Sequence, residues 1–192
     1  HNGQERDPYE GALVRWRLQR LVPALLATGN DELAPVARYL AGDADGRRLA
    51  QLAARVAGLF DSYLVYRPDL TAAWDADRPA PADIAAHAAN ERWQRRLWQA
   101  LTADADARHR VTLMQDFCAD ADRGRLVLPD DLPARVSVFG LPALPPTYVD
   151  ILVRLAQHID IDLYVLSPSR HFWGELLSPA AMGRIEAATG YA

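Results

Sequence analysis

The sequence predicts an α/β fold that is predominantly helical. Apolar residues recur at helical spacing from about residue 11 to residue 120. A strand–helix–strand pattern follows between residues 135 and 166. Half of the 192 residues are hydrophobic and 24% are charged, as in ordinary globular proteins. We therefore expect a helical module over residues 10–125 and a smaller α/β part over residues 126–192.

The helical module should contain several amphipathic helices. Apolar periodicity predicts them at Gly11–Ala27, Leu33–Ala41, Asp45–Val65, Asp69–Trp74, Ala82–Thr102 and Arg110–Asp120. Pro23 should bend or divide the first helix, because proline removes a backbone hydrogen bond and clashes with the preceding turn. Arg67 should end the third helix, because a residue before proline disfavours the α region. In the last helix the side chains expected to face the core are Leu113, Met114, Phe117 and Cys118.

The α/β part should form a parallel pair of strands. Residues 135–140 and 161–166 have the composition of short strands, and residues 147–158 between them have helical periodicity. Strands joined through a helix in this way are normally parallel. Two strands do not make a stable sheet alone. We therefore expect further strands from a partner or from outside these residues, which predicts that the chain is a fragment of a longer protein.

The basic residues exclude several kinds of catalysis. All 21 of them are arginine, so there is no lysine for a P-loop or a Schiff base. The motifs GxxxxGK, GxGxxG and GxSxG are also absent. We expect no catalytic site and no cofactor within this chain. Because the net charge is −4, a nucleic-acid site would have to be a local patch of arginines.

No metal site is expected either. Several aspartates lie close together in the sequence, but we attribute them to a solvated surface: Asp104, Asp106, Asp116, Asp120 and Asp122. The single cysteine, Cys118, excludes an intramolecular disulfide and fits a reducing, cytoplasmic setting. No apolar run reaches the length of about 18 residues that a membrane-spanning helix needs, so no membrane contact is expected.

Three blocks of the sequence combine residues in an unusual order and spacing. The first block is LFDSYLVYRPD at residues 59–69, followed by Trp74. The second is RVSVFGL at residues 135–141, and the third is HIDIDL at residues 158–163, followed by Ser167-Pro168 and Trp173-Gly174-Glu175. The order and spacing of these blocks resemble an early part of a much longer member of the RecC family, the gamma subunits of exodeoxyribonuclease V.

The resemblance implies a degenerate superfamily-1 helicase-like domain of the P-loop type without Walker A. Residues 10–125 would be its helical insertion, and residues 126–192 part of its parallel core. The resemblance also implies RecB-like and RecD-like partners in a helicase–nuclease that repairs double-strand breaks by homologous recombination. Its RecC-like subunit separates the strands, channels single-stranded DNA and scans it for Chi. The partner subunits use the ATP and Mg²⁺.

The same resemblance implies a set of DNA-binding residues: Leu59, Asp61, Ser62, Arg67 and Arg110. Arginine can contact phosphates or base edges, aspartate can accept from a base amine, and leucine can pack on a base. Gly58 and Ser62 differ from the acidic residue and the glutamine that relatives can carry there. One alternative stays open, in which the helices are a scaffold for RecB-like and RecD-like subunits and touch no DNA.

Overall fold

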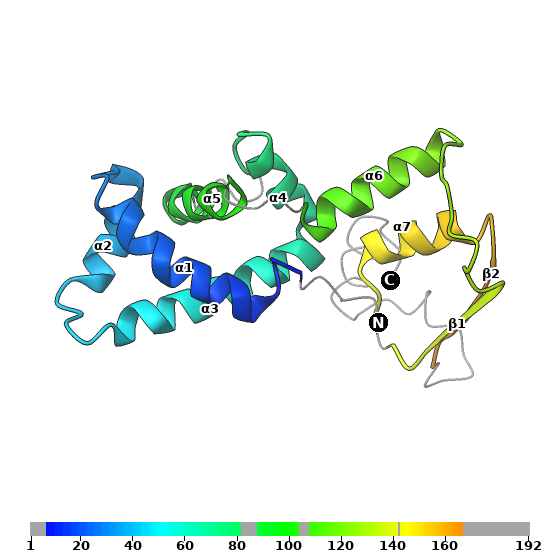
Figure 1. The fold of residues 1–192 in the computed structure, drawn as a ribbon, viewed down its shortest axis with the longest axis horizontal. Helices are drawn as coiled ribbons and strands as arrows, with labels where there is room; N and C mark the ends of the chain where they lie inside the picture. Colours follow the sequence, from blue (N-terminus) through cyan, green and yellow to red (C-terminus); the bar gives the residue numbers. More distant parts are fainter. Residues whose placement is uncertain (1–6, 82–87, 104–107, 142, 167–192) are drawn as a thin grey trace, which may run out of the picture.

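The structure is a computed structural model that describes residues 7–81, 88–103, 108–141 and 143–166 (Figure 1). The elements are α1 (Gly11–Leu26), the 3₁₀ turn η1 (Asp31–Leu33), α2 (Ala34–Leu40), α3 (Arg47–Tyr66), α4 (Pro68–Asp75), α5 (Ala88–Ala103), α6 (Arg110–Asp122), β1 (Arg135–Phe139), α7 (Pro146–Leu155) and β2 (Asp160–Tyr164). Helices α1 to α5 lie together, and α6 leads from them toward β1, α7 and β2 (Figure 1). The predominantly helical α/β fold is therefore confirmed. None of the helices in these ranges is long and apolar enough to cross a membrane.

Helix α1 is continuous through its proline, so of the two predicted effects of Pro23, a bend or a division, the division does not occur. The helix runs from Gly11 to Leu26, and the Ala27 N–H donates to the Pro23 carbonyl at 3.1 Å. Leu18 and Val22 of α1 are 0% and 1% exposed and belong to the main core. Tertiary packing of this apolar face outweighs the one helical hydrogen bond that proline removes.

The break between α3 and α4 falls where the sequence predicts it. Arg67 has φ −135° and ψ 55°, outside the helical region. Pro68 is then the first residue of α4. Proline is well tolerated there, because the backbone N–H that it lacks would have no partner within the helix at the first helical position. The chain therefore changes direction at Arg67, and α4 can pack back against α3.

The core lies among α1, α3, α4 and α5. Phe60 of α3 meets Trp74 of α4 and Trp98 of α5 edge-on, at ring-centroid distances of 6.3 and 5.2 Å. All three side chains are at most 1% exposed. The Trp74 Nε1–H donates to Glu91 at 2.7 Å, and the Trp98 Nε1–H donates to Asp75 at 2.8 Å. Both buried indoles thus keep a hydrogen-bond partner.

Helices α5 and α6 depart from their predicted form in different ways. The described part of α5 begins at Ala88, so residues 82–87 of the predicted helix lie outside the described residues. On α6, Leu113 is 47% exposed, and the prediction that it faces the core is wrong. Val111, in the first turn, is the buried residue of α6. The helix then leaves the bundle and packs on α7, which explains why its later apolar residues are less buried.

Strands β1 and β2 are parallel, as predicted. Their register pairs Arg135 with Asp160 and Phe139 with Tyr164. No residue of the two strands or of α7 is buried, and Phe139 and Tyr164 are 76% and 61% exposed. Among the described residues the sheet has two strands. The expectation of further strands stays a prediction.

Candidate nucleic-acid interface

Helix α3 presents one buried face and one solvent face. Its buried side chains include Val56, Phe60 and Leu64. On the opposite side is a line of residues spaced three or four apart, which we call the α3 strip: Arg55, Leu59, Ser62 and Tyr66. Residues at this spacing lie on one face of a helix. Tyr66 is 70% exposed, and Leu59 is half-buried at the margin.

An ion pair joins α3 to the start of α6. The Arg110 Nη2 group donates to Asp61 Oδ1 at 2.5 Å, across 49 positions of sequence. The arginine side chain is 29% exposed and the aspartate side chain 50% exposed. Consecutive residues of a helix point in different directions, so Asp61 and Arg110 lie on a different side of α3 from the α3 strip. Both charges stay within reach of solvent.

Arg67 is held differently, by the first turn of α4. Its Nε and Nη2 groups donate to the two carboxylate oxygens of Asp69, at 3.0 and 2.9 Å. This two-point hydrogen bond, with a smaller effect of the guanidinium charge, holds the pKa of the Asp69 carboxyl below its ordinary value, against partial burial. The Arg67 side chain is 31% exposed. The guanidinium therefore keeps a defined orientation toward Asp69.

Ser62 makes a local contact. Its Oγ–H donates to the Gly58 carbonyl at 2.9 Å, one helical turn back. A serine hydroxyl bonded in this way still has an oxygen that can accept a hydrogen bond. Since Ser62 is exposed, that acceptor faces solvent along the α3 strip.

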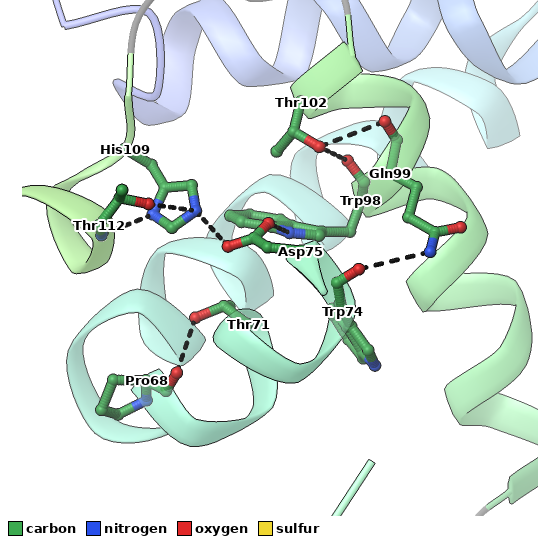
Figure 2. A network of polar contacts seen from close by, with 9 residues as sticks. All are labelled: Pro68, Thr71, Trp74, Asp75, Trp98, Gln99, Thr102, His109 and Thr112. Atoms are coloured by element: carbon green, nitrogen blue, oxygen red, sulfur yellow. Dashed lines mark hydrogen bonds and ion pairs between the residues drawn. The ribbon is translucent and has the colours of Figure 1, made fainter. Parts of the chain in front are cut away.

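The first turn of α6, which carries Arg110, is attached to the bundle through His109. The His109 side chain is 5% exposed, and its Nε2 lies 2.7 Å from Asp75 Oδ2. The other oxygen of Asp75 accepts from Trp98. Figure 2 shows the histidine, the aspartate and the indole pointing toward one another from α4, α5 and the start of α6. Arg110 therefore follows directly after a buried, hydrogen-bonded residue.

The clustered aspartates are ion-paired where the structure describes them. Asp116 pairs with Arg108, Asp120 with Arg125, and Asp122 with Arg154. Asp104 and Asp106 lie outside the described residues. Within the described ranges, no three His, Cys, Asp or Glu side chains converge as a metal-binding group.

The structure brings together part of the predicted site. Asp61 and Arg110 meet in an ion pair, and Leu59 and Ser62 lie together on the α3 strip. Arg67 contacts Asp69 instead of joining that pair. The sequence analysis missed Arg55 and Tyr66. Their positions, four residues from Leu59 and Ser62 respectively, could have shown that they share the same face.

The comparisons with known proteins agree with the three sequence blocks. Residues 1–190 match the family described as RecC, N-terminal domain. The chain belongs to the RecC family. Relatives named RecBCD enzyme subunit RecC include the Escherichia coli protein, 36% identical over 177 residues that cover 90% of this chain. The Haemophilus influenzae protein is 34% identical over 192 residues, covering 88% of the chain. The Mycolicibacterium smegmatis protein is 41% identical over 136 residues, covering 68%.

The RecC relatives are much longer than this chain. The matched region makes up 15% of the Escherichia coli RecC, 17% of the Haemophilus influenzae RecC and 11% of the Mycolicibacterium smegmatis RecC. The chain therefore matches a small part of a RecC protein, within its N-terminal domain. The α3 strip and the Asp61–Arg110 pair are therefore features of a RecC N-terminal domain.

Proposed function

We propose that this chain is part of a RecC-like subunit that guides single-stranded DNA through a RecBCD-like helicase–nuclease without cutting it. The α3 strip is the observation that carries the proposal, and the Asp61–Arg110 pair lies on another side of the same helix. The relatives are named as subunits of the RecBCD enzyme, which supports RecB-like and RecD-like partners. Such an assembly would process double-strand breaks in the cytoplasm for homologous recombination.

The strip offers what a single strand needs. Tyr66 is an exposed aromatic ring, and Leu59 adds a smaller apolar surface about two helical turns away. Stacking of a base on an aromatic side chain stabilises a complex by about 1–3 kcal/mol. A duplex hides the faces of its bases, whereas a single strand exposes them. The strip therefore favours single-stranded DNA.

Arginines lie on or near the same helix. Arg55 lies on the strip, Arg110 reaches Asp61 of α3, and Arg67 follows Tyr66 directly. Guanidinium groups bind phosphate oxygens through paired N–H donors. Asp61 and Asp69 neutralise two of these arginines, so each phosphate must compete with a carboxylate. Contacts of this kind exchange readily, which suits a strand that moves past the site.

Scanning for Chi belongs to the same proposal. The Asp61 carboxylate and the Ser62 hydroxyl are both exposed on α3. A carboxylate accepts from a base amine, and a hydroxyl both donates and accepts. These two side chains would read base edges, while the arginines hold the backbone.

The remaining residues would form a structural framework for the separation of the DNA strands. Parallel strands joined through α7 support the assignment of residues 126–192 to a helicase-like core, with residues 10–125 as its helical insertion. The chain has no lysine with which to build a Walker A site. ATP and Mg²⁺ would therefore act in the partner subunits.

A titration with labelled single-stranded DNA tests the proposal. The chain and its Arg67→Gln/Arg110→Gln variant are compared over a series of salt concentrations. The slope of log K against log salt should fall by about 0.7 for each phosphate that the variant no longer neutralises. Arg125→Gln is the matched control, because it also removes an arginine paired to an aspartate, but at the far end of α6. Equal binding by the double variant and its parent would contradict the proposed contacts.

The protein scaffold is the second candidate, and a different observation favours it. The β1–α7–β2 part exposes Phe139, Leu163 and Tyr164, beside an apolar cavity of about 300 Å³. Exposed apolar patches mark contacts with other chains. This candidate predicts no DNA binding by the parent chain, together with capture of a purified RecB-like or RecD-like subunit. Phe139→Ser/Tyr164→Ser should weaken that capture, and Arg67→Gln/Arg110→Gln should leave it unchanged.

A further inference from the structure

His109 is a buried titratable side chain that the proposed DNA contacts do not use. It precedes α6, where its ring lies 5.2 Å from the ring of Trp98 and 5.5 Å from that of Tyr9. Its Nε2 lies 2.7 Å from Asp75 Oδ2, and the Thr112 N–H points at its Nδ1 from 3.4 Å (Figure 2). Both ring nitrogens therefore have a partner.

These contacts select one tautomer of the imidazole. An ionised carboxylate only accepts hydrogen bonds, so His109 Nε2 must carry the proton that it donates to Asp75. The backbone N–H of Thr112 only donates, so Nδ1 must be the unprotonated nitrogen. The neutral ring thus donates to the end of α4 and accepts from the first turn of α6. We call this pair of contacts the His109 clamp.

The His109 clamp determines the backbone position of Arg110. Beyond the clamp, Val111 is the buried residue of α6. His109 and Val111 flank Arg110 on both sides, at 4% and 1% exposure. The Cα of Arg110 is thereby fixed relative to α4 and α5, and its side chain reaches across to Asp61 on α3.

We infer that His109 is a positioning residue, which holds the first turn of α6 so that the Arg110 guanidinium lies beside Asp61 of α3. Without the bond to Asp75, the start of α6 loses its polar attachment to α4, and Arg110 moves away from its carboxylate partner. The consequence for DNA binding rests on the proposed function. The position of Arg110 itself does not.

Two variants test the two contacts of the His109 clamp one at a time. Asn at position 109 keeps an acceptor near the Nδ1 position and caps α6 well, but it is too short to reach Asp75. Gln at position 109 keeps an amide N–H near the Nε2 position and loses the capping acceptor. The inference predicts that His109→Asn releases Arg110 and that His109→Gln largely retains it.

The position of Arg110 is measured without DNA. The full chain and both variants are treated with phenylglyoxal, and the modification rate of each arginine is followed by peptide mass spectrometry. In His109→Asn the rate at Arg110 should rise several-fold, while the rate at Arg67, held by its neighbour Asp69, stays the same. In His109→Gln the Arg110 rate should stay near that of the parent.

Two outcomes would overturn the inference. The first is an Arg110 rate in His109→Asn equal to that of the parent. The second is a joint rise at Arg110, Arg67 and the partly buried Arg17, because that would mean general loss of the fold. Thermal unfolding and far-ultraviolet circular dichroism of the same samples tell local release from unfolding.

The DNA consequence is tested in the full-length RecC-like subunit assembled with its partners. His109→Asn should lower the salt slope of single-strand binding as much as Arg110→Gln does, and combining the two should cause no further loss. Combining His109→Asn with Arg67→Gln should give additive losses. Additive losses for His109→Asn with Arg110→Gln would overturn the positioning role. If Arg110→Gln alone leaves binding unchanged, the proposed Arg110 contact fails, and the modification rates still decide the position of Arg110.

Discussion

The helical bundle and the β1–α7–β2 part of this RecC-family chain both follow regular apolar patterns, yet within the described residues only the bundle has a core. Leu18, Phe60 and Trp98 of the bundle are at most 1% exposed. Among the described residues, β1, α7 and β2 contribute no buried side chain. An amphipathic pattern produces an element, but burial requires a second layer to cover its apolar face. The bundle has that layer within the chain.

The largest expected difference between the two parts comes from a matched pair of truncations. Phe60→Ala should lower the free energy of unfolding by about 3–5 kcal/mol, because it leaves a cavity between Trp74 and Trp98. Phe139→Ala, at a side chain that is 76% exposed, should change it by less than about 0.5 kcal/mol. Urea unfolding followed by tryptophan fluorescence measures both. Similar losses from the two variants would mean that β1 has a buried face in solution.

The next effect concerns the polar edge of the bundle. Asp75→Asn should cost about 1–3 kcal/mol, because an amide N–H replaces the oxygen that accepts from the buried His109. The matched control is Asp77→Asn, since an asparagine oxygen can still accept from Gln99 and asparagine tolerates the φ of +50° found there. Thermal unfolding of the two variants gives the comparison. Equal losses would show that the buried hydrogen bond adds nothing beyond an exposed one.

The smallest expected effect concerns the ion pair between α6 and α7, where the helical bundle meets the β1–α7–β2 part. Arg154 of α7 donates from Nε and Nη2 to the Asp122 carboxylate of α6, at 2.8 and 2.9 Å. These hydrogen bonds hold the pKa of Asp122 below its ordinary value. A carboxyl whose folded pKa is lowered stabilises the contact above the ordinary pKa, about 3.9, and the effect disappears as the pH falls through the lowered value.

Carboxyl chemical shifts measured during an acid titration test this ion pair. Arg154→Gln should raise the pKa of Asp122 toward its ordinary value. The lowered pKa of Asp69, which depends mainly on its bond to Arg67, should not move in the same variant and serves as the internal control. An unchanged pKa of Asp122 in the Arg154→Gln variant would mean that the α6–α7 ion pair does not form in solution.

Local rules predicted much of this fold. The end of α3 at Arg67 and the parallel strands follow from backbone sterics and from the crossover connection, which act within a few residues or one unit. The burial of Leu113 is mispredicted, because apolar periodicity indicates which face of a helix is apolar but not how far a neighbouring helix extends to cover that face. Arg55 and Tyr66 could have been found by continuing the spacing of Leu59 and Ser62 along α3.

The sequence by itself determined the helices and the two strands, because each depends on residue order over short distances. It also determined the RecC-family membership, because the order and spacing of the three blocks can be read along the chain. The tertiary structure alone decided which charges meet. Asp61 and Arg110 are 49 positions apart and become neighbours only because α6 starts against α3 and α4. His109 and Asp75, 34 positions apart, fix that start. Pairings across such distances depend on how whole helices pack, and no local pattern encodes that packing.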